Sequence, residues 1–568
     1  MYAISKKFRD NNNRFGHTCM VLILIIGLPV SLLSQNLNNP NKQGPIGTQV
    51  NTISGNLFIP RTDIYVPARG FDLNMTFFYN SFLSQEEHGF GKGWSFGYNI
   101  KYINDTATQG NKIIFWGDGR EDTYDSVSPG RYNTPVGFFD SLSQYQPGKF
   151  LIKNREGVKY YFENGVHKHI TKMEEPSGNF IQFTYSDSLL SSLTNNAGQT
   201  IRFSYNVTGR LATMTDEIAA PAIIFTYIYD VNGNLVEVKD PLGGRSRYTY
   251  LVNGPMKTIA DKNNNVADLI YFPDMTVREI IGCNKRMSFS YDTSSNTTVV
   301  TDHLETGNQI TKYTYDKNDQ LYWIKNIKGN CCGLNESYDY DEYGNRVKMK
   351  DANGQEYTYT YDGNGNMLTA TDPLGQVSTY TYTSDFNKIK TYKDPKGYLY
   401  TLSYDAHGNM TQLIMPGNNI YAATYNTTGN IITSTDPKGN VYTYNYDALG
   451  NPTNVTGPEG YTAALSFNAR GNLLSYTDAR GNNSSAEYDI LNRLKKITDP
   501  VNNNTQLNYD AAGNMVSYKN KNNETNWRSY DASNRLVKIK GPTGNEFNYT
   551  YDGMDNLLSV KDPLGFEN

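Results

Sequence analysis

From about residue 315 onward, aromatic and polar side chains alternate along short segments of the chain. Tyr357, Tyr359 and Tyr361 alternate with threonines, and residues 398–404 have a similar pattern. Because successive side chains of a β-strand point to opposite faces of a sheet, each such segment predicts a strand with one aromatic face. Shorter stretches of mixed β-formers, such as residues 431–435, alternate with these segments and predict a partner strand.

The aromatic strands recur with a period of 21 residues. Each ends in an aromatic residue, here called an anchor, that precedes Asp or a similar residue. The regular anchors are Tyr340, Tyr361, Tyr382, Tyr404, Tyr425, Tyr446, Phe467, Tyr488, Tyr509, Tyr530 and Tyr551. A looser series continues upstream through Tyr161, Tyr185, Tyr205, Tyr229, Tyr250, Tyr271, Tyr291 and Tyr315. Such a period predicts one supersecondary unit that is copied along the chain.

Two tight turns separate the strands of each copy. The first corner follows the anchor as Tyr-Asp-x-x-Gly-Asn, where Asp can bond its own backbone and Gly can take a positive φ. The second corner is Asp-Pro-x-Gly, in which proline presets φ at the second turn position. The turn positions that we single out are Gly365, Gly408, Gly450, Gly513, Pro373, Pro395, Pro437 and Pro563. One copy is therefore expected to be two short strands and two turns.

These patterns predict an all-β chain, an array of short antiparallel hairpins of about 21 residues each. The tyrosines should stack as columns across neighbouring hairpins. Open twisted sheets seldom exceed about ten strands without curling, so the array should form a curled ribbon or a partial hollow shell. Columns of exposed tyrosines can also bind sugars, but a column present in every copy is what packing requires, and we favour packing.

The upstream part of the chain divides into further segments. Residues 45–124 contain short predicted strands between Gly, Pro and Asn turns without the 21-residue period, which indicates a separate small β domain. Residues 125–150 are turn-rich and are expected to connect this domain to the repeat array at 151–568. The array should be regular from about residue 315, and the sequence stops within a repeat.

The first 34 residues are typical of a secretory signal peptide. Basic residues precede the apolar run Val21–Leu33, which is too short for a bilayer core of about 30 Å, and the small residue Ser34 follows. An uncleaved membrane anchor is the alternative. Residues 35–44 are expected to be a flexible leader. We therefore expect a secreted or cell-surface protein whose membrane contact is limited to the signal segment.

Composition excludes several classes of protein. The chain has 46 tyrosines, 49 glycines and 67 asparagines among 568 residues, and its net charge is −4. The aromatic content excludes a disordered chain, and the glycines lack the period of collagen. Without a basic surface the chain is not expected to bind nucleic acid.

Residues with potential chemistry are few. Cys283, Cys331 and Cys332 are too sparse for a disulfide framework and are expected to be loop cysteines. His167 and His169 share a strand face, but no cluster completes a metal site. The segment Glu86–His88 permits an acid–base pair, although a solvated loop is the favoured interpretation. Residues 362–373 depart from a calcium loop at two positions. We therefore expect no cofactor, metal or catalytic residue.

The Tyr-Asp…Gly-Asn…Asp-Pro-x-Gly unit resembles the YD repeat of RHS (rearrangement hot spot) proteins. Residues 50–118, with Gly-Phe-Gly-Lys-Gly-Trp-Ser, resemble the N-terminal domain of unknown function that precedes those repeats. The resemblance implies a ribbon wound into a hollow β shell, as in toxin-complex shell subunits and teneurins. In bacterial members this shell encloses a toxic C-terminal domain used in contact-dependent competition. No shell-closing core, self-cleavage site or toxin follows the repeats in this sequence.

We therefore expect a non-enzymatic shell or scaffold, which is secreted or displayed on the cell surface. Its partners would be a toxin domain or the missing remainder of the shell. The alternative is a cell-surface adhesin or carbohydrate-binding module that recognises cell-surface glycans. A hydrolytic enzyme is the least favoured of the three hypotheses because the familiar short catalytic motifs are missing from the sequence.

Overall fold

The computed structural model describes residues 41–163, 167–218, 221–305, 307–318, 321–330 and 334–567. The predicted signal peptide, leader residues 35–40, Cys331 and Cys332 lie outside this range. Within it the chain is all-β, as predicted, with 3₁₀ turns only at Pro45–Gly47 (η2) and Ser81–Leu83 (η3). No helix in the described part is long and apolar enough to cross a membrane.

A small antiparallel sheet of five strands comes first. Its strands follow chain order: β1 (Asn41–Gln43), β2 (Gln49–Asn51), β3 (Leu57–Val66), β4 (Leu73–Asn80) and β5 (Trp94–Phe96). Asn41 of β1 is paired with Asn51 of β2. Residues 41–43, expected in a flexible leader, are therefore part of the sheet, because their main-chain groups find partners in β2.

All remaining strands belong to one long antiparallel sheet in which each strand pairs with the next. Its upstream half comprises β6 (Lys101–Asn104), β7 (Lys112–Phe115), β8 (Glu121–Ser128), β9 (Arg131–Asn133), β10 (Ser141–Gln146), β11 (Lys149–Lys153), β12 (Lys159–Phe162), β13 (Lys172–Glu174), β14 (Phe180–Ser186), β15 (Leu189–Asn195), β16 (Thr200–Tyr205), β17 (Leu211–Asp216), β18 (Ile223–Tyr229), β19 (Leu235–Lys239), β20 (Arg245–Tyr250), β21 (Met256–Ala260), β22 (Val266–Tyr271), β23 (Val277–Gly282), β24 (Lys285–Asp292), β25 (Thr297–Asp302), β26 (Gln309–Asn318) and β27 (Leu321–Gly329).

The downstream half contains the regular repeats. It comprises β28 (Asn335–Tyr340), β29 (Arg346–Lys350), β30 (Glu356–Tyr361), β31 (Met367–Thr371), β32 (Val377–Tyr382), β33 (Ile389–Lys393), β34 (Leu399–Tyr404), β35 (Met410–Met415), β36 (Asn419–Tyr425), β37 (Ile431–Thr435), β38 (Val441–Tyr446), β39 (Pro452–Thr456), β40 (Thr462–Phe467), β41 (Leu473–Thr477), β42 (Asn483–Tyr488), β43 (Leu494–Thr498), β44 (Asn504–Tyr509), β45 (Met515–Lys519), β46 (Thr525–Tyr530), β47 (Leu536–Lys540), β48 (Glu546–Tyr551) and β49 (Leu557–Lys561). No ladder within the described ranges joins β49 to β6, so the sheet is open.

The boundary between the two sheets differs from the expected domain boundary. Strands β6, β7 and β8 lie within residues 101–128 and pair as part of the long sheet. The expected connector 125–150 likewise contains β9 and β10, which pair with each other. Strand pairing requires main-chain partners but no fixed repeat length, so the sheet begins well before the 21-residue period does.

Many hairpin corners are built around one carboxylate, and in others an Asn amide oxygen takes its place. The amide of Gly365 donates to the carbonyl of Asp362 (3.0 Å), and Gly365 has a φ of +70°. Asp362 Oδ1 accepts from the amides of Asn364 and Asn366, both at 2.9 Å. The ladder between β30 and β31 shifts register at Tyr361, next to this corner. The corner therefore has the predicted features: the Asp side chain bonds to the main chain and Gly has a positive φ.

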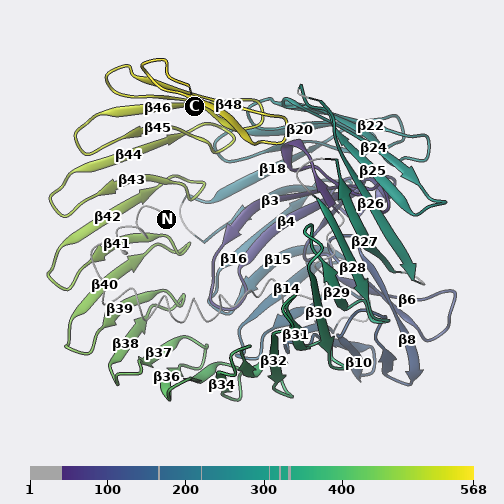
Figure 1. The fold of residues 1–568 in the computed structure, drawn as a ribbon, viewed down its shortest axis with the longest axis horizontal. Coiled ribbons are helices and arrows are strands. Elements are labelled where there is room, and N and C mark those ends of the chain that lie inside the picture. The colour runs from purple at the N-terminus through teal and green to yellow at the C-terminus, as the bar shows by residue number, and fades with distance from the viewer. Residues whose placement is uncertain are drawn as a thin grey trace.

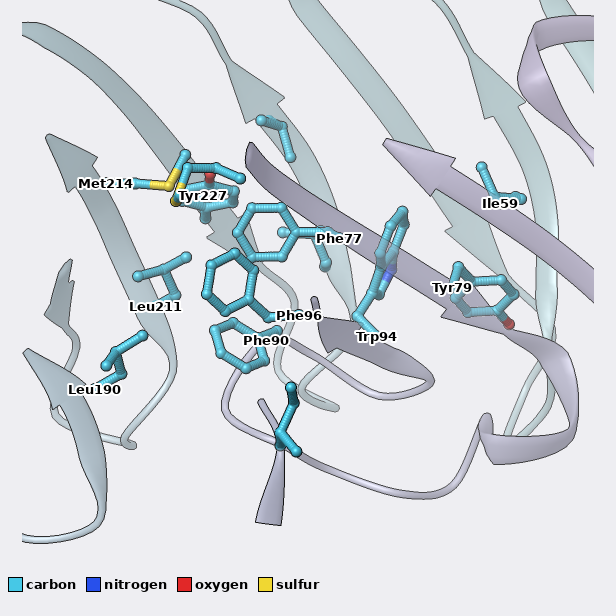
Figure 2. Packing of buried hydrophobic residues seen from close by; sticks show 14 of the residues in the cluster. Ile59, Phe77, Tyr79, Phe90, Trp94, Phe96, Leu190, Leu211, Met214 and Tyr227 are labelled. Atoms are coloured by element: carbon cyan, nitrogen blue, oxygen red, sulfur yellow. The ribbon is translucent and has the colours of Figure 1, made fainter. Parts of the chain in front are cut away.

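The ribbon coils on itself, as predicted, and the small sheet lies in its concave side (Figure 1). Figure 2 shows Phe77 of β4 and Phe96 of β5 beside Tyr227 of β18. The ring centres of Phe77 and Tyr227 are 5.5 Å apart, and the side chain of Trp94 in β5 is completely buried. The main core is therefore the interface between the small sheet and the inner face of the upstream half.

Candidate functional site: the inner face and seam of the ribbon

The anchor tyrosines fasten each hairpin to the preceding one. The hydroxyl of Tyr361 donates to the carbonyl of Arg346 on β29 at 2.9 Å. The other regular anchors do the same: Tyr340 to Ile324, Tyr382 to Met367, Tyr404 to Ile389, Tyr425 to Met410, Tyr446 to Ile431, Tyr488 to Leu473, Tyr509 to Leu494, Tyr530 to Met515 and Tyr551 to Leu536. Phe467 has no hydroxyl and cannot make this bond.

Burial keeps these phenols in their neutral, donating form. Burial, with a smaller contribution from Tyr425, raises the pKa of Tyr404 to about 12. Burial likewise raises the pKa of Tyr488 and of Tyr509. The anchors are thus structural, and their hydroxyl bonds explain why the repeat favours tyrosine over other aromatic residues at this position.

Among the described residues, tyrosines stack on one another in one part of the inner face. The rings of Tyr380 and Tyr392 are 5.1 Å apart, and those of Tyr392 and Tyr400 are 5.5 Å apart, with both pairs stacked. Along the next strands the corresponding row is Leu402, Leu413 and further mixed residues. The predicted column through every hairpin is therefore wrong, because leucine and other residues take the place of tyrosine in the rows that follow.

The two halves of the inner face differ in burial. In the upstream half, Phe203 and Met214 are buried beneath the small sheet. In the downstream half, Tyr359, Tyr380 and Tyr400 are only half-buried, and the threonines on the opposite face of β30 are exposed. Tyr359 and Tyr380 stand two residues before their anchors, as the core residue Phe203 does in the upstream half, so these rings lie on the concave face of the coil. Figure 1 shows the curvature of the downstream half.

Successive turns of the coil meet along a line that we call the seam. Here second corners of the upstream half contact first corners of the downstream half. Amide side chains cross it, among them Asn387 to the carbonyl of Arg155 (2.8 Å), Asn179 to the carbonyl of Thr428 (3.0 Å), Gln199 to the carbonyl of Ala469 (2.9 Å) and Asn263 to Asp510 Oδ2 (3.0 Å). The contacts join residues 232 to 270 positions apart in the chain.

The most buried ion pair of the seam is Arg470 with Asp216. Nε of Arg470 lies 2.9 Å from Oδ2 of Asp216, and the two side chains are 7% and 0% exposed. Nη2 of Arg470 is buried without a hydrogen-bond partner. The pair spans 254 residues and joins the corner after β40 to the end of β17.

Arg69 of the small sheet's β3–β4 loop also reaches the seam. Its guanidinium donates to the carbonyls of Thr428 (3.1 Å) and Gly429. It borders a cavity of about 360 Å³ that is lined by Asn196, Asn445 and Tyr444, among others. The first corner at 447–451 meets Arg69 there, and the cavity is an interruption in the seam.

The singled-out turn residues fall into two environments. Gly408 and Gly450, in first corners, lie against Phe386 and Arg69. Gly365 accepts at 3.5 Å from Arg155, while Gly513 has open space around it. Pro373, Pro395, Pro437 and Pro563 are in second corners at the other rim, where neighbours such as Leu374 and Leu564 are exposed.

The remaining candidates take structural positions. Cys283 is a free, buried thiol at the corner between β23 and β24, and its carbonyl accepts from Ser533 across the seam. His169 stacks on Tyr185, with ring centres 5.3 Å apart. Glu86 and Glu87 are exposed, as the solvated-loop interpretation predicted, although Glu87 binds Arg210 and the ring of His88 packs against Phe115. Among the described residues, no three His, Cys, Asp or Glu side chains come together as a metal site.

Comparisons with protein families match most of the described chain. A family model described as the teneurin YD-shell matches residues 274–482, and the RHS Repeat model matches residues 467–501 and 530–567. A model described as Domain of unknown function (DUF6531) matches residues 47–124.

Similar proteins include two from Bacillus. The tRNA3(Ser)-specific nuclease WapA of Bacillus spizizenii is 22% identical over 338 residues, which are 52% of this chain and 13% of that protein. The tRNA nuclease WapA of Bacillus subtilis is 26% identical over 139 residues, which are 24% of this chain and 6% of that protein. The chain thus spans only a small part of the length of these relatives.

Similar solved structures are components of Tc toxins. TcdB2-TccC3 without the hypervariable C-terminal region has a TM-score of 0.43 at 12% identity, covering 87% of this chain and 32% of that one. A Photorhabdus luminescens Tc holotoxin pore has a TM-score of 0.42 at 10% identity, covering 90% of this chain and 34% of that one.

Proposed function

Because this chain is an RHS/YD-repeat protein whose repeats follow a DUF6531 domain, we propose that it forms the wall of a hollow shell that encloses a polypeptide. The proposed role is non-enzymatic. The cargo is a toxin domain, and the shell is secreted or displayed on the cell surface for contact-dependent competition between bacteria. The remainder of the shell is a second partner.

One observation carries the proposal: a single ribbon, joined to itself along a seam, leaves a concave tyrosine face half-exposed. Tyrosine combines a large apolar ring with a hydroxyl, so it can contact an extended polypeptide of any sequence. Tyr380, Tyr392 and Tyr400 place three such rings side by side on that face. The outward threonines of β30 offer no comparable surface.

Cysteine labelling tests enclosure directly. Tyr357→Cys and Thr358→Cys place thiols on opposite faces of β30, one residue apart, in a chain whose native cysteines are replaced by serine. Both thiols should react with N-ethylmaleimide, but only the outer one should react readily with a maleimide on a large polymer. Equal rates with the polymer reagent would overturn enclosure by this chain.

The cargo is tested separately. A reading frame that continues downstream and encodes a shell-closing core and a variable domain would identify that domain as the toxin partner. When that longer product is expressed, limited proteolysis should spare the terminal domain until the ribbon is denatured. A terminal domain cut as quickly as the same domain expressed alone would contradict the toxin-carrier role.

The cavity at the interruption of the seam favours a second candidate, a glycan-binding module. Its lining combines Tyr444 with the amides of Asn196 and Asn445, the groups that hydrogen-bond and stack on neutral sugars. A glycan array of the purified chain tests this function. Binding that is lost in Asn445→Ala but kept in Asn508→Ala, at the same position of a later repeat, would support it, and a silent array would exclude it.

A further inference from the structure

The loop at residues 84–93 fastens the small sheet to the long one. Glu87 Oε1 accepts from the amides of Gly89 (3.0 Å) and Gly91 (3.1 Å), while Oε2 accepts from Arg210 (2.7 Å). The carbonyl of Gly89 accepts from the amide of Leu211 at 2.8 Å. We call this loop the clamp, since it is held to the first corner between β16 and β17.

Two histidines line one small cavity behind the clamp. His88 from the clamp and His169 from the long sheet both border a space of about 50 Å³. The ring of His88 lies 4.9 Å from that of Phe115, and Nε2 is 3.4 Å from Oε2 of Glu86. Nδ1 of His169 is buried without a hydrogen-bond partner. Neither imidazole therefore has a well-formed acceptor for an added proton.

A basic side chain, that of Lys101, lies near both histidines. The main chain of Lys101 pairs with that of His169, and its Nζ lies 5.2 Å from the centre of the Phe115 ring, which His88 also contacts. Burial first, and Lys101 second, lower the pKa of His88 to about 4. The same two causes, with a contribution from His167, lower the pKa of His169 to about 4.

The surrounding charges do not compensate for two further protons. Glu87 is already bound to Arg210, and the side chain of Glu86 is 52% exposed. Burial lowers the pKa of Lys101, and the smaller effects of Glu86 and Glu121 on this group oppose that shift. The phenols of Tyr98, Tyr185 and Tyr205, which border the cavity, stay neutral because burial raises their pKa values.

We infer that the clamp is an acid-sensitive fastening: protonation of His88 and His169 releases residues 84–93 from the long sheet. Released imidazoles regain the ordinary pKa of about 6.5, so the open form binds more protons than the closed form. Docking is therefore complete above about pH 6.5 and weakens as the pH falls towards 4. With two protons linked, the docking constant changes by up to about 100-fold per pH unit in that range.

Hydrogen exchange of the full chain, followed by mass spectrometry between pH 7.5 and pH 4.5, measures the release. After correction for the intrinsic pH dependence of exchange, peptides spanning 84–93 and 206–212 should lose at least about tenfold protection on acidification. The corner at 341–345 should not change. Equal behaviour of all three segments would overturn the inference.

Three variants separate this effect from general acid unfolding. His88→Gln with His169→Gln should keep the clamp protected at pH 4.5, whereas His407→Gln, in an exposed seam corner, should behave as the wild type. Lys101→Met removes the positive charge near the two imidazoles. It should flatten the pH dependence of clamp protection even if the double variant folds poorly. An unchanged acid response in both Lys101→Met and the double variant would refute the role of these histidines.

Discussion

The hydroxyl of Tyr446 lies 2.7 Å from the main-chain carbonyl oxygen of Ile431, to which it donates. The bond crosses from the last residue of β38 to the first residue of β37, the strand with which β38 pairs. It satisfies a carbonyl beside a corner where the ladder changes register. The same relationship, repeated along the ribbon, gives each copy a polar fastening to its neighbour in addition to the strand ladder.

Tyr446→Phe should lower the free energy of unfolding by about 0.5–1.5 kcal/mol, because the carbonyl of Ile431 loses its donor while the ring is retained. Chemical denaturation followed by circular dichroism measures the change. Tyr398→Phe is the control, since Tyr398 is exposed and its hydroxyl should matter by less than about 0.5 kcal/mol. Equal effects of the two substitutions would contradict the fastening role.

Phe467→Tyr should stabilise the chain by about 0.5–1.5 kcal/mol. Phe467 has the same place in its ladder as Tyr446, since Phe467 pairs with Leu473 and Tyr446 pairs with Pro452. A hydroxyl on residue 467 should therefore point to the carbonyl of Pro452 on the preceding strand, β39. The denaturation midpoint reports the gain. A Phe467→Tyr protein no more stable than the wild type would show that this anchor position differs from the others.

Asp216→Asn should destabilise the seam by about 3–5 kcal/mol, because it leaves the charge of Arg470 buried without its partner. Removing both charges, as Asp216→Asn with Arg470→Met, should recover much of the loss. Exchange protection of residues 468–472 localises the effect to the seam. A double variant as unstable as the sum of its single substitutions would contradict a direct ion pair.

Two glycines of one repeat provide a matched test of the seam. Gly439 and Gly450 both have a φ of +82°, so alanine is strained at either position by about 1–2 kcal/mol. A Cβ at Gly439 meets open space, whereas one at Gly450 would lie 2.9 Å from Cβ of Arg69. Thermal denaturation should therefore show Gly450→Ala to be the more destabilising, and equal melting temperatures would refute the contact.

Alkaline solution should unfold the ribbon abruptly. The pKa of Tyr404 is about 12 in the folded chain because of burial, against about 10 in the unfolded chain. The folded state therefore binds more protons, so the stability contributed by this group is intact below pH 10 and is lost as the pH rises towards 12. Since many anchors share the effect, tyrosinate absorbance and circular dichroism should change together. Gradual ionisation before any loss of structure would contradict anchor burial.

The hairpin, its two corners and the coiling of the ribbon could be predicted because they depend on local sequence. The corner at Asp362 is formed within five successive residues that include an acid and a glycine. The coiling follows because a long open sheet curls. The hydrogen bond of the anchor hydroxyl could not be predicted from the sequence. Its acceptor is a main-chain carbonyl, which no side-chain pattern marks.

The seam could not be predicted, because every first corner resembles every other. Nothing in the residues around Arg470 indicates that this copy meets Asp216, 254 residues upstream. The predicted small domain at 45–124 agrees with the DUF6531 match at 47–124, but the point at which the long sheet begins could not be predicted, for a related reason. Strands β6 to β8 pair through their main chains before the repeat period begins, and the pattern of side chains does not record that pairing.

The seam has a consequence for how such a chain can change in length. His407 contacts Pro176 across 231 residues, and Asn534 contacts Asp261 across 273, so each contact depends on how many copies lie between its two members. Gain or loss of one copy within that interval would shift every later corner to the wrong partner. The copies are thus interchangeable in sequence but not in number. The contacts between the first and second turns of the coil fix how many copies can lie between them.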